Sequence, residues 1–492
     1  MKKKLLSTLL CGVLTASMLA GCGSVETADE PATEDAAEEV AEDAAEETEE
    51  AAEETEEATE DAAEGEEGEA EPEAVTTEGD PNGTHMEMWS FVEAHNTFYA
   101  KMLEKWNEAN PDRTIEITFT TYPYGDMHQK LLMSLQTGEG APDICDVEMG
   151  QVPNVYEGLD TWLYPLDDSM APYADDMLAS RLAAYQGSDG KQYGAPFHVG
   201  ATVMYYNMAR LEEAGITQED VDAVVTWDDY TALGEKYLEA TGNEEGKYFT
   251  SVDTGGADWL WIAMAEYGDD WTGGFDGTAN VQLDSVRNML TMQQDWLNSG
   301  FAEVSPDGHI DLEAGFQNIL DGNIVSFPKA MWYMSRFINY MPEEEGNWYI
   351  TKCPVFEEGQ NCSVGIGGTG TVVTQQSVDA QLAADFLCYA KMSPEGETMI
   401  WNDLGFDVCN TSLWDDETFA HDESNQYNTF FRNYPYDVLN SISDQIGTIM
   451  TVKISPTINE YVCNTTLNEI LEEGMDVDEA LQELQDAIDL EQ

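Results

Sequence analysis

The sequence predicts an α/β fold with two lobes joined by crossing strands and separated by a cleft. Three observations support this prediction. The chain has 492 residues, whereas single hydrophobic cores stop growing near about 250–300 residues. Strand and helix patterns alternate between residues 86 and 147. A long apolar stretch at residues 191–210 then separates this part from a second part with its own strands and helices.

The first lobe is predicted from a β-α-β-α-β succession, which indicates a parallel sheet covered by helices. Ligands of such sheets bind beyond the carboxyl ends of the strands, so residues 89–90, 122–124 and 146–148 are expected on one rim. The expected strands are 86–91, 114–122 and 141–147, and the expected helices are 93–110 and 126–137.

Residues 191–210 begin polar and turn at Pro196. They continue with valine, threonine, methionine and tyrosine, which is typical of a buried strand. We interpret this stretch as the first strand to cross between the lobes. The later elements expected are a helix capped by Thr226 or Asp228, a helix opening near Asp258, a strand at 324–327 followed by a rim segment at 328–333, a return crossing at 350–355 and a final amphipathic helix at 477–488.

The charge of the chain is strongly negative and unevenly distributed. The formal net charge is −79, and residues 25–80 hold 27 of the 98 acidic residues and no lysine or arginine. Such a surface repels phosphate backbones, so we expect no nucleic-acid partner. The repeated Ala-Glu-Glu and Glu-Glu-Thr units contain too little apolar surface for a core, so residues 23–82 are predicted to be a disordered acidic linker. A calcium-binding acidic tail is the alternative.

The N-terminus has the pattern of a secretory signal in residues 1–22, with three lysines before an apolar run. Leu19-Ala20-Gly21-Cys22 resembles a bacterial lipobox, in which the cysteine is acylated and anchors the protein to the bilayer. An ordinary signal with a chance cysteine is the alternative. Lipidation at Cys22 would place the folded part at the extracellular face of the cell membrane.

The remaining cysteines match no zinc spacing. Whether Cys353 and Cys362 form a disulfide stays open, and the alternative is that they are buried thiols. Residues 307–313 could bind a structural Ca²⁺, although the spacing misses the EF-hand register and favours a plain turn. We expect no metal and no cofactor in the functional site.

Eight short segments then occur in a characteristic order. These are Gly140–Ile144, Tyr164–Asp167, Tyr193–Pro196 with Tyr205–Asn207, Ala214–Ile216, Thr226–Asp228, the segment ending at Trp332, Ala383–Leu387 and Ser393–Gly396. Together they resemble the extracellular solute-binding proteins of sugar ABC importers, the maltose-binding-protein superfamily. The resemblance covers nearly all of residues 84–492. It implies a type II periplasmic-binding-protein-like fold, with lobe 1 at about 84–196 and 354–415 and lobe 2 at about 197–353 and 416–492.

The resemblance also implies a site. Trp332 falls where the family places an aromatic side chain that stacks on a sugar ring, and Gly200 stands where maltose-binding protein has an acid, which argues against maltose. Trp259 falls on the family's contact helix of the second lobe, and Trp261 is either its buried partner or its competitor for that contact. The expected ligand-binding residues are Trp89, Tyr122, Asp146, Glu148, His198, Asp258, Trp259, Trp332, Tyr333 and Gly368.

The resemblance implies a monomeric, lipid-anchored receptor that delivers a sugar, expected to be an oligosaccharide of arabinose or lactose type, to the permease subunits of an ABC importer. We expect no enzymatic activity. Two alternatives stay open. One is a secreted glycoside hydrolase, although no spacing identifies an acid and nucleophile pair. The other is a surface carbohydrate-binding or sensory module without transport.

Overall fold

The computed structural model describes residues 71–274 and 277–491. The predicted signal sequence with Cys22, and the predicted linker up to residue 70, lie outside the described residues. Ala70–Gln492 form one compact unit. Within the part of the chain that the structure describes, no helix is both long and apolar enough to cross a membrane.

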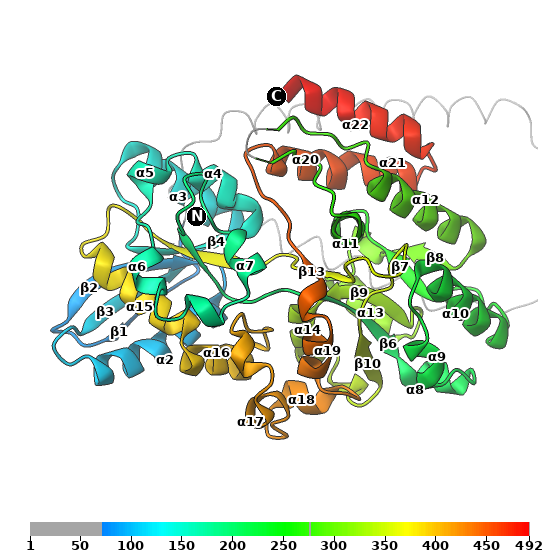
Figure 1. The fold of residues 1–492 in the computed structure, drawn as a ribbon, viewed down its shortest axis with the longest axis horizontal. Coiled ribbons are helices and arrows are strands. Elements are labelled where there is room, and N and C mark those ends of the chain that lie inside the picture. Colours follow the sequence, from blue (N-terminus) through cyan, green and yellow to red (C-terminus); the bar gives the residue numbers. More distant parts are fainter. Residues whose placement is uncertain (1–70, 275–276, 492) are drawn as a thin grey trace, which may run out of the picture. The chain divides into compact units, whose positions relative to one another are not determined.

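Lobe 1 is built on a six-stranded sheet in the order β1-β3-β2-β4-β12-β5 (Figure 1). The three strands predicted from the β-α-β pattern, β3, β2 and β4, are parallel neighbours, whereas β1, β12 and β5 pair antiparallel. The strands are β1 (Ala74–Gly79), β2 (Thr84–Ser90), β3 (Ile115–Thr121), β4 (Ile144–Glu148), β5 (Gly194–Pro196) and β12 (Thr369–Val373).

Helices cover this sheet because their apolar residues recur on one face. In α2 (Glu93–Ala109), Phe98, Met102, Leu103 and Trp106 are buried, as the helical spacing predicted. Gly138 ends α3 (Tyr124–Thr137) in the left-handed conformation that glycine adopts without strain. The other helices of this lobe are α4 (Val152–Tyr156), α5 (Leu159–Trp162), α6 (Asp167–Met170), α7 (Ala179–Ala183), α15 (Ala380–Met392) and α16 (Pro394–Met399).

The predicted linker boundary at residue 82 needs correction, because β1 lies inside it. β1 pairs with β3 over six residues, from Ala74 opposite Thr121 to Gly79 opposite Glu116. Its side chains are mostly exposed, so its composition resembles that of a linker. Backbone pairing at the sheet edge needs no apolar side chains, which is why composition alone did not reveal this strand.

Lobe 2 contains a smaller antiparallel sheet in the order β10-β6-β9. These strands are β6 (Thr202–Asn207), β9 (Ser326–Ala330) and β10 (Trp348–Thr351), and a parallel pair, β7 (Thr250–Val252) and β8 (Ala302–Val304), lies nearby. β9 begins later than predicted and includes Pro328. Because β9 is an edge strand, the missing N–H of proline costs no central ladder bond.

The helices of lobe 2 also follow local signals. Thr226 caps α10 (Trp227–Ala240) in a reciprocal capping box with Asp229. The others in sequence order are α8 (Met208–Glu213), α9 (Gln218–Asp222), α11 (Asp258–Tyr267), α12 (Asp284–Ser299), α13 (Glu313–Leu320) and α14 (Met334–Tyr340).

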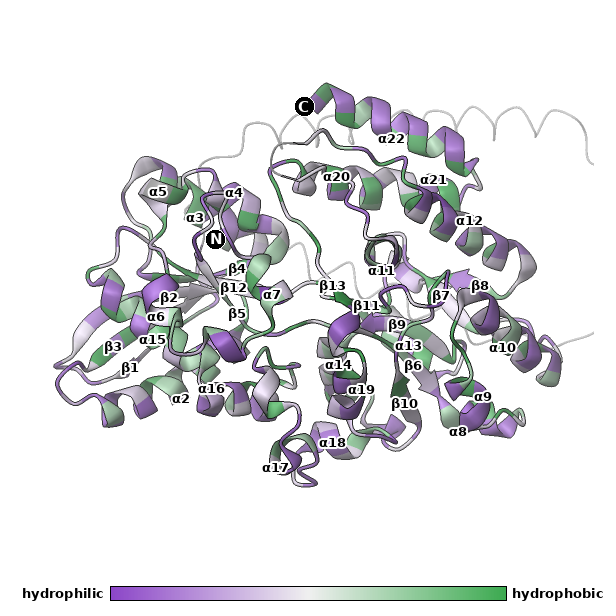
Figure 2. Ribbon diagram, viewed as in Figure 1, coloured by the Kyte–Doolittle hydropathy of each residue, from purple (hydrophilic) through white to green (hydrophobic). Residues whose placement is uncertain are grey.

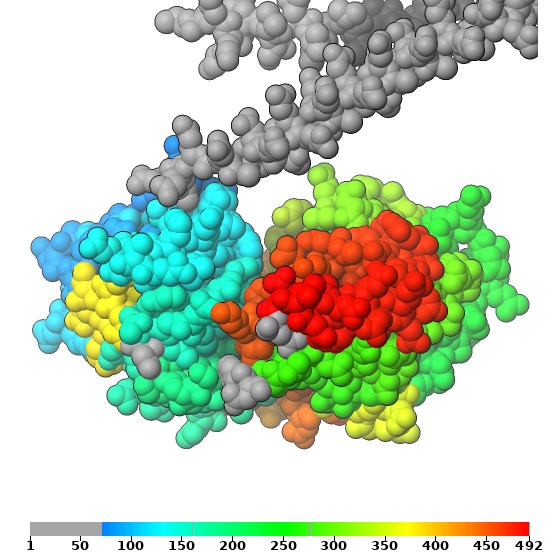
Figure 3. All heavy atoms as spheres, turned by 90° about the horizontal axis from the view of Figure 1, so that it is seen from above, coloured from blue at the N-terminus to red at the C-terminus, as the bar shows by residue number. Residues whose placement is uncertain are grey.

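Three C-terminal helices complete this lobe: the second and third pack on α12, and the third also packs on the first and the second. They are α20 (Ser455–Tyr461), α21 (Leu467–Leu471) and α22 (Val477–Glu491). The predicted amphipathic pattern of α22 is present, with Leu481, Leu484 and Ile488 buried and apolar and polar residues alternating along the ribbon (Figure 2). Seen from above, these helices cover much of that face of lobe 2 (Figure 3).

Residues 191–210 do cross between the lobes, but as two strands in two sheets. β5 ends at Pro196 in lobe 1 and β6 starts at Thr202 in lobe 2. A second crossing follows β11 (Ser363–Val364) and leads into β12, and it lies beside the first through the bridge Ala201 to Gly365. β13 (Ile446–Gly447) pairs with β11 at the same place.

The predicted return crossing at 350–355 was therefore about ten residues too early. Thr351 still pairs with β6 in lobe 2, and Cys353 packs in the lobe 2 core. A short apolar segment is equally typical of a sheet strand and of a crossing, and only the pairing partner distinguishes the two.

Residues 417–441, predicted to lie in lobe 2, pack against both lobes. They form α17 (Glu417–Ala420), α18 (Gln426–Phe430) and α19 (Pro435–Ser441). Tyr436 packs edge-on against Trp401, with ring centroids 4.9 Å apart, next to α16 of lobe 1. Phe431 packs against Phe337 of α14 in lobe 2, with centroids 5.5 Å apart.

Candidate ligand-binding site

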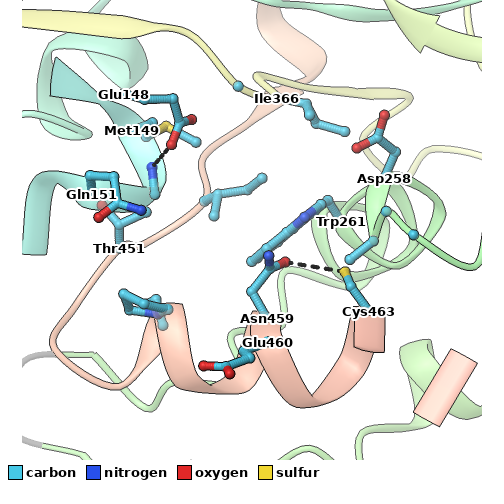
Figure 4. A pocket seen from close by; sticks show the side chains of 18 of the residues that line it. Glu148, Met149, Gln151, Asp258, Trp261, Ile366, Thr451, Asn459, Glu460 and Cys463 are labelled. Atoms are coloured by element: carbon cyan, nitrogen blue, oxygen red, sulfur yellow. Dashed lines mark hydrogen bonds between the residues drawn. The ribbon is translucent and has the colours of Figure 1, made fainter. Parts of the chain in front are cut away.

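A cavity of about 580 Å³ lies between the carboxyl end of β4, the start of α11 and the helix α20. This volume is within the usual range for small-molecule sites. Its lining consists of Tyr124, Glu148, Met149, Gly150, Gln151, Gly255, Gly256, Ala257, Asp258, Trp261, Ile366, Gly367, Ile449, Thr451, Ser455, Pro456, Asn459, Glu460, Cys463 and Asn464. Figure 4 shows Glu148 and Gln151 on one side and Asp258, Trp261 and Asn459 on the other.

The lobe 1 wall is centred on Glu148, the last residue of β4. Its carboxylate accepts hydrogen bonds from the backbone N–H of Gly150 at 2.7 Å and from the Tyr124 hydroxyl at 3.2 Å. Burial raises the pKa of Glu148 above its ordinary value, and these hydrogen bonds oppose that rise. Tyr124 is 43% exposed, and its side chain lies beside an oriented carboxylate.

His128 joins the two parts of this wall. Its Nδ1 donates to the Tyr124 carbonyl at 2.7 Å, and its Nε2 accepts the backbone N–H of Glu148 at 3.1 Å. Burial lowers the pKa of His128 to about 4, so the ring is neutral at physiological pH, as this pairing requires. The imidazole therefore ties the start of α3 to the end of β4.

The lobe 2 wall comes from the first turn of α11. Asp258 and Trp261 are three residues apart on the helix and so share a face. The Asp258 carboxylate pairs with the buried Lys329 ammonium at 2.6 Å, and the Trp261 ring packs edge-on against Trp271 with centroids 4.7 Å apart. Each cavity side chain is thus held by a neighbour behind it.

The third wall is polar and comes from the C-terminal part of the chain. Asn459 and Glu460 lie on α20, and Cys463 and Asn464 lie in the π-helical turn Val462–Thr466 that follows. π-helical turns are rare in proteins, and those that occur are often found at functional sites. Amide and carboxylate groups here can accept from or donate to a ligand's hydroxyl groups.

The structure places Glu148 and Asp258, of the ten expected residues, in the cavity lining. Two others adjoin it. The indole Nε1 of Trp332 donates to the Ile366 carbonyl at 3.2 Å, and the Gly368 carbonyl accepts the Met149 N–H at 2.9 Å. Trp332 therefore contacts the lining residue Ile366 of the second crossing, and Gly368 contacts the lining residue Met149 of lobe 1.

The other six expected residues are buried away from the lining. Asp146 accepts hydrogen bonds from His95, Tyr99 and Thr371. Trp259 packs with Trp227 and Trp296 in the lobe 2 core. The remaining four are Trp89 and Tyr122, which pack edge to face, His198, which lies beside Asp407, and Tyr333, which donates to the Ile310 carbonyl.

These differences have physical causes. The sheet that carries β4 is covered on both faces, so Asp146 points into the layer of α2 while Glu148 leaves the sheet at the strand end. In α11, Trp259 and Trp261 are two residues apart and so lie on different faces of the helix. Trp261 is three residues after Asp258, shares its face and reaches the cavity. Tyr124 and Trp261 had detectable signals in the sequence. Residues 449–464 gave no such signal, because they reach the cavity only by packing near segments that are distant in the sequence.

A model of the bacterial extracellular solute-binding protein family matches residues 90–391. This is more than half of the chain, and the chain belongs to this family. Similar proteins include an arabinooligosaccharide-binding protein of Halalkalibacterium halodurans, 35% identical over 424 residues and covering 85% of this chain and 92% of the relative. An arabinooligosaccharide-binding protein of Bacillus subtilis is 36% identical over 399 residues, and this match covers 79% of this chain and 89% of the relative.

Solved structures share the two-lobed fold. The sugar-binding protein MalE from Xanthomonas citri superposes with a TM-score of 0.69 at 18% identity, covering 82% of this chain and 96% of that one. The galacto-N-biose- and lacto-N-biose I-binding protein of the Bifidobacterium longum ABC transporter superposes with a TM-score of 0.64 at 20% identity. This match covers 84% of this chain and 97% of that one. At these identities the likeness establishes the fold, and it confirms the predicted type II architecture.

Proposed function

We propose that this protein is an extracellular receptor that binds an oligosaccharide, of the arabinose-containing class, and delivers it to an ABC importer. The observation that supports this most is the 35% identity to an arabinooligosaccharide-binding protein over nearly the whole folded part. The cavity supports it independently, because its composition suits a sugar.

A sugar ring presents C–H faces that pack on aromatic rings and hydroxyl groups that hydrogen-bond to carboxylates and amides. Tyr124 and Trp261 provide aromatic surfaces from the two lobes, and Glu148, Asp258 and Asn459 provide polar groups. Hydrogen bonds to ionised carboxylates are stronger than neutral ones. We assign Tyr124 and Trp261 to stacking and the carboxylates to hydroxyl recognition, and Trp332 to a contact at the adjoining crossing.

Binding without chemical change is part of the proposal, since the compared relatives are named as binding proteins. Delivery to a membrane permease and acylation of Cys22 belong to it as well. The supporting features are the lipobox-like sequence and the acidic linker, which would hold the folded unit away from the membrane surface.

The test is a thermal-shift screen of the full chain against linear arabino-oligosaccharides, galacto-oligosaccharides, lactose and maltose, with a parallel assay for new reducing ends. A ligand that binds only the folded state raises the melting temperature by mass action. We expect a rise with arabino-oligosaccharides and no new reducing ends. New reducing ends would instead indicate a glycoside hydrolase, and no rise with any sugar would contradict the proposal.

The stacking role is tested with Tyr124→Ala. Aromatic contacts contribute roughly 0.5–1.5 kcal/mol beyond buried area, so we expect affinity to fall about tenfold without a matching loss of stability. Tyr340→Ala is the matched control, because Tyr340 is 56% exposed and lies outside the lining. Equal affinities for both variants would remove Tyr124 from the site.

A further inference from the structure

The cavity lining contains carboxylates but no cationic side chain among its described residues. Glu148 comes from β4, Asp258 from α11 and Glu460 from α20, so each of three walls contributes one carboxylate (Figure 4). Among the described lining residues there is no lysine, arginine or histidine. A ligand that enters the cavity therefore encounters carboxylates from three directions.

Two buried cations, Lys329 and Arg181, contact lining residues but are engaged within the protein. Lys329 is 1% exposed and its ammonium lies 2.6 Å from Asp258 and 3.4 Å from Asp253. Its charge is shared by two carboxylates, and Asp258 alone of these three residues reaches the cavity. Lys329 thus orients Asp258 without presenting its own N–H groups to a ligand.

Arg181 lies behind the wall formed by Met149 and Gly367. Its Nε donates to the His198 carbonyl at 2.8 Å, its Nη1 contacts the Met149 sulfur at 3.4 Å and its Nη2 donates to the Gly367 carbonyl. The Arg181 side chain is buried, and its N–H donors are occupied by protein acceptors.

A third cation, Lys453, lies two residues from the lining residues Thr451 and Ser455 and pairs with Glu157 at 2.6 Å.

We propose that the cavity selects neutral oligosaccharides and rejects glycans that carry anionic substituents such as uronic acids. This inference rests on the proposed function and specifies its substrate class. Neutral hydroxyl groups donate to the three carboxylates, whereas an anionic substituent meets like charges and no lysine, arginine or histidine among the described lining residues. In a partly desolvated cavity such repulsion is stronger than in water.

The experiment compares an α-1,5-linked arabinotriose with a trimer of galacturonic acid, measured by calorimetry on the full chain at neutral pH. We expect the anionic trimer to bind at least about a hundredfold more weakly. Binding of both trimers within threefold of each other would overturn the inference and leave the proposed function standing. Failure of arabinotriose and every other neutral oligosaccharide in the screen to bind would overturn both.

A charge-neutral variant tests whether the lining carboxylates cause the discrimination. In Glu460→Gln the ratio of the two affinities should fall at least fivefold, whatever the change in arabinotriose binding itself. Glu108→Gln removes the same charge from α2, outside the cavity, and should leave the ratio unchanged. A ratio that responds equally to both variants, or to neither, would contradict the assignment to the cavity.

Discussion

At the scale of single residues, buried ionisable groups support the site from behind. Lys329 is the clearest case, because it is paired with Asp253 and Asp258 and completely enclosed. These neighbouring carboxylates raise its pKa despite burial, which keeps the ammonium charged. The pair fixes a cavity carboxylate in a position where an exposed aspartate would be mobile.

Lys329→Met tests this support. Removing one partner of a buried ion pair leaves an uncompensated charge and costs about 3–5 kcal/mol, so the free energy of unfolding should fall by that order in urea denaturation. Lys236→Met, at an exposed pair with Asp220, should change it by less than about 1 kcal/mol. Similar losses for both variants would show that Lys329 is not structurally special.

Asp407 provides a second residue-scale prediction, at the first crossing. Its carboxylate accepts the N–H groups of Gly200 at 3.1 Å and Ala201 at 2.8 Å. Burial raises its pKa to about 7, while these backbone donors and Arg181 act in the opposite direction. Because the folded-state pKa is above the unfolded value, the contribution to stability is complete below pH 3.8 and is lost as pH rises through about 7.

The wild type should therefore lose stability relative to Asp407→Asn between about pH 4 and pH 7, by up to roughly 4 kcal/mol at 1.36 kcal/mol per pKa unit. Urea denaturation of both proteins at several pH values measures the difference. Parallel stability curves would contradict the raised pKa.

At the scale of elements, β1 shows that a sheet edge can be formed by a segment with the composition of a linker. Its pairing with β3 covers a strand edge that would otherwise be open. Open edges invite pairing with other chains. The acidic residues Glu71, Glu73 and Glu78 beside this edge discourage such pairing by repulsion.

A chain that starts at residue 81 should be less stable than one that starts at residue 71. Each lost backbone hydrogen bond contributes about 1 kcal/mol, so we expect a loss on the order of 3 kcal/mol, together with more self-association. Denaturation and light scattering measure the two effects. Equal behaviour of the two chains would mean that β1 adds nothing to lobe 1.

At the scale of the whole molecule, the two crossings connect the lobes on one side of the cavity, and an ion pair lies at another edge. Lys453 precedes α20 of lobe 2, and Glu157 follows α4 of lobe 1. The side chains are largely exposed, so the pair adds little to stability. It lies where movement between the lobes would separate its two charges.

Lys453→Glu places like charges at this position. We expect bound oligosaccharide to dissociate roughly twofold to fivefold faster at low salt, and the difference to shrink as salt screens the charges. Stopped-flow fluorescence measures the rate. Lys236→Glu, which reverses the charge of a pair outside the cavity lining, should have no effect, and a change of the same size there would contradict the interpretation.

The sequence by itself determined the parts that depend on local physics. The spacing of Phe98, Met102 and Trp106 defined a helix face, and the β-α-β succession predicted parallel neighbours in lobe 1. The sequence also limited the cap of α10 to Thr226 or Asp228, and the structure shows Thr226 in that place. The end of β4 and the start of α11 were also recognisable, which is why Glu148 and Asp258 were predicted and do line the cavity.

Only the tertiary structure decided the rest. The burial of Asp146 and Tyr333, the choice of Trp261 over Trp259, and the third wall from residues 449–464 all depend on which distant segments pack together. The return crossing at Gly365 and the edge strand β1 likewise depend on pairing partners. The local sequence pattern fixes which face of a helix or strand a residue occupies. Long-range packing determines whether that face contacts protein or a cavity.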